Sequence, residues 1–128
     1  MMSLLANESK FDFDPGLKKV GIEMFAIVNS FGRIIHSEKF ESLQLEHDKM
    51  EMFLMGFSLQ HSMLKDFDDE FGPVHYTVTE RNGRKFFSAP LRDNNIILVV
   101  TKIWTSNKQV IRHLEDLRHQ FTSGEERR

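Results

Sequence analysis

The chain has 128 residues, no cysteine and a net charge of −2, and 40% of its residues are hydrophobic. These values are typical of one globular domain. The small net charge gives no electrostatic reason to expect nucleic acid or an anionic membrane surface as the main ligand. Without cysteine the chain has no disulfide, thiolate zinc site or cysteine nucleophile, which favours a cytoplasmic protein.

The N-terminal residues lack the basic and apolar regions of a signal peptide. No apolar run approaches the length of a membrane span, so we expect a soluble protein without membrane insertion. Residues 1–22 are weakly patterned, although Asp14 followed by Pro15 could open a short helix. We expect a single domain over residues 23–122 and a flexible charged tail over 123–128.

The first regular element is predicted to be a β-hairpin. Residues 23–29 are apolar on both faces of a strand, and residues 33–39 resume an extended pattern. Asn29 and Gly32 between them are suited to a tight turn.

The next element is predicted to be one long helix over residues 45–71, ended by Gly72 and Pro73. Its apolar residues form an arc that is wider than a helix needs to lie on one sheet, with Leu54 and Met55 outside the arc and Gln60 inside it. The rest of the chain supplies only one sheet. We therefore expect the surplus apolar surface to contact another protein chain.

Three strands and a final helix follow. Residues 74–80 alternate between apolar and polar, Asn82-Gly83 marks a hairpin turn, and residues 84–89 return as a strand. Residues 96–104 contain an unbroken apolar core, which is typical of a central strand. Ser106 and Gln109 have the spacing of a capping box, and Gly124 is placed to end the helix that begins there.

These patterns predict an α/β (α+β) fold with a central five-stranded antiparallel sheet. The strands at 23–29 and 96–104 belong at its centre, and the alternating strand at 74–80 belongs at an edge. The predicted order is second, first, fifth, fourth, third. A helix over 45–71 is long enough to cross all five strands on one face, which leaves the final helix for the other face.

The hairpin FAIVNSFGRIIHS resembles that of the Roadblock-type dynein light chain family, a profilin- or longin-like α/β sandwich, and the order of elements from Glu23 to Phe121 resembles it as well. The resemblance implies that two protomers pair through the long helix and the edge third strand, making one continuous sheet. It also implies a scaffold or regulator around small GTPases and motors. The chain departs from the family at residues 1–20, which predict at best a short first helix.

The search for catalytic chemistry is negative. The glycines are isolated turn residues rather than a phosphate loop, and no serine lies in a nucleophile elbow. His47 and Glu51 are one helical turn apart without a third metal ligand, and the acidic run at 66–70 lacks the glycine and glutamate positions of a calcium loop. We therefore expect no enzyme, no metal and no cofactor.

The predicted function is an interaction module that forms a homodimer, or a heterodimer with a related module, and takes a small GTPase as a further partner. The chosen interface residues come from the long helix and the edge strand: Phe53, Phe57, Gln60, Leu64, His75, Thr77 and Thr79. The other edge of the apolar arc, formed by Met52, Met55 and Leu59, is an open alternative. Protonation of His61 or His75 within the contact would weaken it near pH 6.

A small-molecule sensor domain of PAS or GAF type is the alternative function. Twelve phenylalanines are many for this length, and an internal pocket lined by Phe25, Phe86 and Phe87 would serve such a role. Sensors of this kind place several short helices in mid-chain, whereas this chain has one long helix there.

Overall fold

A computed structural model of the protein describes residues 19–39 and 44–126. Most of the weakly patterned N-terminal segment, including the predicted short helix after Asp14, lies outside these residues. The described elements are β1 (Ile22–Val28), β2 (Ile34–Lys39), α3 (His47–Lys65), α4 (Asp68–Phe71), β3 (Thr77–Glu80), β4 (Arg84–Pro90), a 3₁₀ turn η1 (Arg92–Asn94), β5 (Ile96–Lys102) and α5 (Asn107–Glu126).

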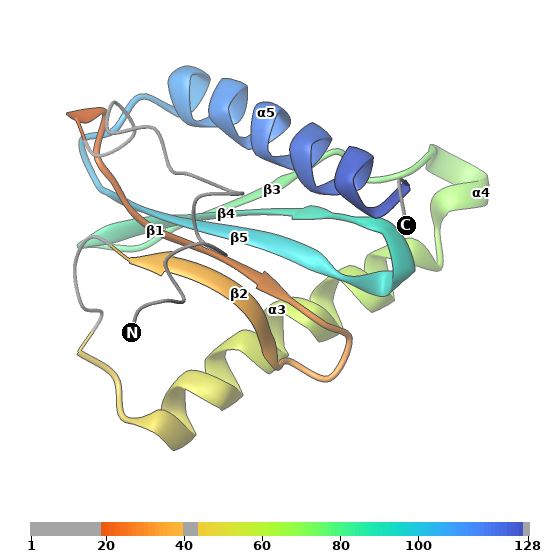
Figure 1. The fold of residues 1–128 in the computed structure, drawn as a ribbon, viewed down its shortest axis with the longest axis horizontal. Helices are drawn as coiled ribbons and strands as arrows, with labels where there is room; N and C mark the ends of the chain where they lie inside the picture. Colours follow the sequence, from red (N-terminus) through yellow and green to blue (C-terminus); the bar gives the residue numbers. More distant parts are fainter. Residues whose placement is uncertain (1–18, 40–43, 127–128) are drawn as a thin grey trace.

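The five strands form one antiparallel sheet in the order β2-β1-β5-β4-β3. Helix α3 runs diagonally under one face of the sheet, and α5 covers the other face (Figure 1). The predicted fold class, strand order and placement of both long helices are therefore confirmed.

The two cores lie on opposite faces of the sheet because side chains alternate along each strand. Every residue of β1 and the first six of β5 are buried, as expected for central strands covered on both faces. Phe87 joins the core under α5, and its neighbour Phe86 joins the core above α3. The adjacent phenylalanines thus fill both cores.

The turn between β1 and β2 fixes the hairpin against α3. The Asn29 Oδ1 atom accepts hydrogen bonds from the backbone N–H groups of Phe31 and Arg33, at 2.9 and 3.1 Å. Gly32 has φ of +82°, and a Cβ atom at this position would lie 2.7 Å from the Met55 Cα atom. Glycine is needed here for both its backbone conformation and the close approach of the helix.

The predicted continuous helix over 45–71 is wrong at its C-terminal end. Helix α3 stops at Lys65, and Phe67, with φ of −108° and ψ of 14°, separates it from the four-residue α4. The N–H groups of Asp66 and Phe67 bond three residues back, to Met63 and Leu64. Acidic side chains are unfavourable at a helix C-terminus and favourable at an N-terminus, so the acidic run suits a break followed by a new helix.

Several other element boundaries differ from the prediction, most of them by one or two residues. Strand β3 begins at Thr77, not at residue 74, and β5 ends at Lys102. Helix α5 continues through Gly124 to Glu126, into the predicted tail. Its start agrees with the prediction, since the Gln109 N–H group lies 3.4 Å from the Ser106 Oγ atom.

A buried carboxylate sits where β1, β5 and β4 lie side by side. Glu23 is 3% exposed, and its two oxygens accept hydrogen bonds from Arg84 Nε at 2.6 Å and Lys102 Nζ at 3.1 Å. Desolvation by burial raises the pKa of this carboxyl, but the hydrogen bonds and charges of the two cations together outweigh burial and lower it. This cluster ties three neighbouring strands together.

No helix among the described residues combines the length and the apolar character needed to cross a bilayer.

Candidate interaction surface

Helix α3 is apolar on two opposite sides. Its sheet-facing side buries Leu54, Phe57, Ser58 and His61. Leu54, expected outside the main apolar arc, is 1% exposed and so belongs to the core. The predicted orientation of α3 about its own axis is therefore wrong. Apolar residues occur on both sides of the helix, so the sequence pattern does not show which side meets the sheet.

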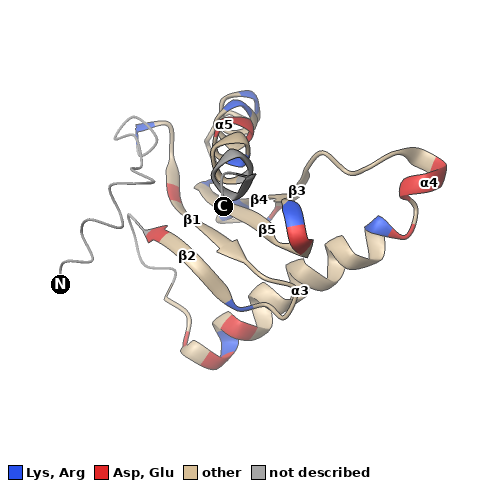
Figure 2. Cartoon of the chain, turned by 45° about the vertical axis from the view of Figure 1, so that its right-hand side comes forward, with Lys and Arg blue, Asp and Glu red and all other residues tan. Residues whose placement is uncertain are grey.

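The opposite side of α3 exposes an apolar stripe, which we call the outer stripe. Its members are large and recur every three or four residues: Met52 (74% exposed), Met55 (37%), Leu59 (55%) and Met63 (66%). Charged residues occur at the two ends of the helix and are absent from residues 52–64 between them (Figure 2). Such an exposed apolar patch is typical of a protein contact surface.

The structure places the four predicted interface residues of the helix at different depths. Phe57 is 8% exposed and Phe53 is half-buried, and their rings lie 6.1 and 5.1 Å from the ring of Phe86. Gln60 is exposed, and Leu64 is 36% exposed. Gln60 and Leu64 are thus accessible on one flank of α3, whereas Phe57 supports that flank from within the core.

The predicted strand residues lie at the β3 edge of the sheet. His75 is exposed and precedes β3, and Thr77 and Thr79 are half-buried within it. The Arg81 N–H group donates to the Arg84 carbonyl, which makes these residues a hydrogen-bonded pair.

Hydrogen-bonded and non-hydrogen-bonded pairs alternate along an antiparallel ladder. Thr77 and Thr79, opposite Ser88 and Phe86, are therefore hydrogen-bonded to β4. The N–H groups of Val78 and Glu80 point away from β4, toward the open edge. Sequence reasoning missed these two donors, although the Asn82-Gly83 turn could have located them by fixing the pairing.

A chain of polar side chains joins α3 to β3 through β4. The His61 Nε2 atom lies 2.7 Å from the Ser88 Oγ atom, which lies 2.6 Å from the Thr77 Oγ1 atom. Ser88 is fully buried and His61 is 8% exposed. Desolvation by burial lowers the pKa of His61, so the imidazole is held neutral.

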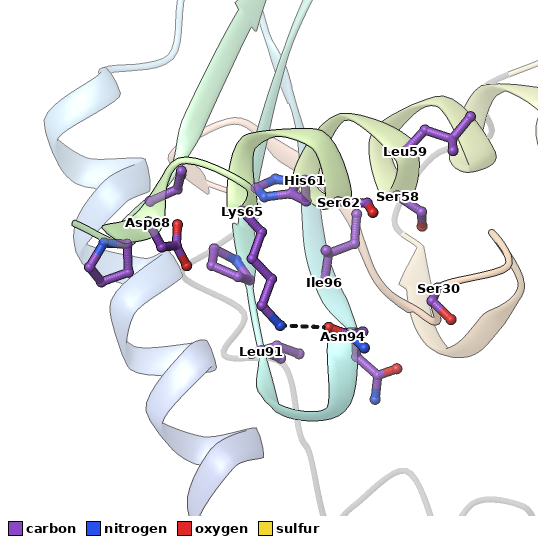
Figure 3. Close-up of a pocket in the computed structure, with 14 residues that line it drawn as sticks. Ser30, Ser58, Leu59, His61, Ser62, Lys65, Asp68, Leu91, Asn94 and Ile96 are labelled. Carbon is purple, nitrogen blue, oxygen red and sulfur yellow. Dashed lines mark hydrogen bonds between the residues drawn. The ribbon is translucent and has the colours of Figure 1, made fainter. Parts of the chain in front are cut away.

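A pocket of about 300 Å³ lies on the flank of α3 that faces the strand turns. The serine, histidine and lysine side chains of α3 form one wall, and the turn between β4 and β5 forms another (Figure 3). The Lys65 Nζ atom donates to the Asn94 Oδ1 atom at 2.9 Å across the pocket. The sequence did not predict this pocket because its residues come from four separate segments.

The pocket predicted for the sensor alternative does not form. Phe25 and Phe87 are fully buried under α5, and Phe86 lies on the other side of the sheet against α3. A sheet separates these rings, so they cannot line one cavity. None of them lines the pocket beside α3.

The layer order, the strand order and the single long helix in mid-chain define a Roadblock/LC7-type fold, as the sequence resemblance indicated. Among solved structures, MglB from Myxococcus xanthus is similar over 98% of this chain and 99% of its own, with a TM-score of 0.74 and 12% identity. A Roadblock/LC7 domain from Streptomyces avermitilis covers 77% of this chain and 81% of its own, with a TM-score of 0.62 and 13% identity.

An MglB structure described as having a tetrameric arrangement covers 84% of this chain and 79% of its own, with a TM-score of 0.69 and 6% identity. At these identities the similarity establishes the fold. No family model matches the sequence, and a search of curated proteins gave no match.

Proposed function

We propose that the protein is a non-catalytic interaction module that pairs with a second copy of itself, or with a related module, and acts as a scaffold for a further partner. The observation that carries an interaction role is the outer stripe of α3. Met52, Leu59 and Met63 are each more than half exposed on a helix that already buries its opposite side. An isolated domain gains nothing from this second apolar side, whereas a docking surface requires it.

The pairing combines the open edge of β3 with the adjacent flank of α3. The outward N–H groups of Val78 and Glu80 would bond to the same strand of the second copy, in the β-augmentation mode. Gln60 and Leu64 lie on the flank that would meet the symmetry-related helix, with Phe53 at its edge. Gln60 could hydrogen-bond its symmetry mate and so set the register. His75, Thr77 and Thr79 line the same edge.

Two comparisons support assembly. A tetrameric arrangement is described for an MglB of the same fold. The resemblance to the Roadblock family implies pairing through the same two elements and a role beside small GTPases.

We assign the outer stripe to such a further partner, because methionine side chains adapt to varied surfaces. We place the assembly in the cytoplasm.

Light scattering behind size exclusion tests the pairing. The unmodified protein should elute as a dimer with twice the 15.1 kDa mass of the chain. Val78→Pro removes an outward donor without removing a bond to β4, and Leu64→Asp charges the adjacent flank; each should give a monomer with an unchanged circular dichroism spectrum.

Phe71→Ala is the matched control, since Phe71 is 84% exposed on α4, outside the proposed contact. This variant should remain dimeric. A monomeric unmodified protein would overturn self-pairing.

A small-molecule sensor remains the second candidate function, favoured by one observation. The pocket beside α3 is lined by charged, polar and apolar groups together, in place of the phenylalanine cavity that the sequence suggested.

A further inference from the structure

The pocket beside α3 has the size and composition of a small-molecule site. Its volume of about 300 Å³ is at the lower end of the range for ligand pockets, which suits a molecule smaller than a nucleotide. Four segments enclose it: α3, the segment from Asp68 to Val74, the turn between β4 and β5, and Ser30 in the turn between β1 and β2 (Figure 3).

One side of the pocket is apolar and held in place. Val74, Leu91 and Ile96 line it, and Ile96 is 2% exposed at the start of β5. The turn beside them is closed by a 3.2 Å hydrogen bond from the Asn95 N–H group to the Arg92 carbonyl. Its central residues, Asp93 and Asn94, both have φ near +60°, a conformation that Asp and Asn tolerate well.

The other side of the pocket carries one cation and one carboxylate. Lys65 ends α3 and Asp68 begins α4, and both project to the pocket side of the helix break (Figure 3). Lys65 Nζ donates to Asn94 Oδ1, which leaves two of its three protons for a ligand. Among the described residues the structure records no ion pair between Lys65 and Asp68.

The remaining polar groups add no charge. The Ser58 hydroxyl donates to the Asn29 carbonyl at 2.8 Å, so it faces a ligand as an acceptor. His61 is kept neutral by desolvation, which lowers its pKa. The pocket therefore offers a single positive group, a single negative group and an apolar wall.

We propose that this pocket binds a free amino acid with an apolar side chain. The α-carboxylate is bound by the Lys65 ammonium and the Asn94 amide, and the α-ammonium group by the Asp68 carboxylate. The side chain packs against Val74, Leu91 and Ile96. A simple anion satisfies only Lys65, and a simple amine satisfies only Asp68, whereas an amino acid satisfies both.

Binding at this site is independent of the pairing proposed above. Ser58, Ser62 and Lys65 lie on one flank of α3, and Gln60 and Leu64 lie on the opposite flank, as the 3.6-residue period requires. Ligand binding and self-association can therefore succeed or fail separately.

The test is a titration of the ¹⁵N-labelled full chain with L-leucine, followed by amide chemical shifts. We expect saturable shifts confined to the amides that line or flank the pocket, at residues 30, 58–68, 74 and 91–96. Lys65→Met keeps the aliphatic stem but removes the charge, and should weaken binding at least about tenfold; Asp68→Asn should act similarly. Lys49→Met, an exposed lysine in the first turn of the same helix, should leave binding unchanged.

Two analogues separate the ligand classes. Leucinamide lacks the carboxylate and 4-methylpentanoate lacks the amine, so each should bind at least about tenfold more weakly than L-leucine. No saturable shift up to the solubility limit of L-leucine overturns the proposal. Equal binding of 4-methylpentanoate and L-leucine, with no effect of Asp68→Asn, also overturns it in favour of a simple carboxylate site.

Discussion

His61 on α3 and Ser88 on β4 are joined by a 2.7 Å hydrogen bond between Nε2 and Oγ, which places an imidazole in the core between helix and sheet. The Ser88 Oγ atom also forms a hydrogen bond with the Oγ1 atom of Thr77 on the edge strand. The helix and the strand that form the proposed pairing surface are thus connected through one buried polar chain.

This connection predicts a pH dependence of stability. Burial lowers the pKa of His61 below its ordinary value of 6.5, so the unfolded chain takes up a proton at a higher pH than the folded protein. The free energy of unfolding should therefore fall as the pH drops from 6.5 toward the lowered pKa of His61. The expected loss is about 1.4 kcal/mol for each pH unit by which folding lowers this pKa. Urea titrations of the unmodified protein and of His61→Gln measure this. An equal slope in both would show that His61 is not responsible.

The Glu23 cluster predicts a separate loss of stability in acid. The pKa of the Glu23 carboxyl is lowered from 4.5. The contribution of Glu23 to the free energy of unfolding is therefore fully present above pH 4.5 and is lost as the pH falls through the lowered pKa. Glu23→Gln should remove this acid dependence and lower the free energy of unfolding at neutral pH by about 1–3 kcal/mol.

Glu115→Gln is the control for that experiment, since Glu115 makes only a half-exposed contact of 3.8 Å with Arg118. We expect Glu115→Gln to change the free energy of unfolding by no more than about 0.5 kcal/mol. Similar losses in the two variants would contradict a special role for the buried carboxylate.

Two leucines on α3 test which side of the helix faces the sheet. Leu54→Ala should lower the free energy of unfolding by about 2–5 kcal/mol, because Leu54 is 1% exposed in the core. Leu59→Ala, at a residue 55% exposed on the outer stripe, should change it by about 0.5 kcal/mol or less. Denaturation of both variants at a protein concentration where the chain is monomeric gives the comparison; the reverse ranking would mean that the helix is rotated.

A pair of glycines tests the contact between the hairpin and α3. Gly32→Ala forces alanine into a left-handed backbone at φ of +82° and brings its Cβ atom within 2.7 Å of the Met55 Cα atom. We therefore expect the free energy of unfolding to fall by about 2 kcal/mol or more. Gly83→Ala meets no heavy atom within 4 Å and should have little effect. Thermal unfolding of the two variants measures the difference, and an unaffected Gly32→Ala protein would rule out the close approach.

The sequence by itself determined the sheet and its order. Residues 23–29 and the core of 96–104 are apolar on both faces, which indicates central strands, and the alternation over 74–80 indicates an edge strand. With antiparallel neighbours and short turns, these constraints leave one arrangement, which the structure has. The resemblance to the Roadblock family rested on the same element order and holds at the level of fold.

Only the tertiary structure decided which side of α3 is buried. Leu54 and Leu59 are chemically identical and belong to apolar sides that a helical wheel cannot rank, and contact with Phe86 and its neighbours selects the side of Leu54. The break after Lys65 was likewise undetermined, because acidic residues are compatible with both a helix end and a helix start. The pocket depends on four segments meeting in space, and sequence spacing carries no information about the contact between Lys65 and Asn94.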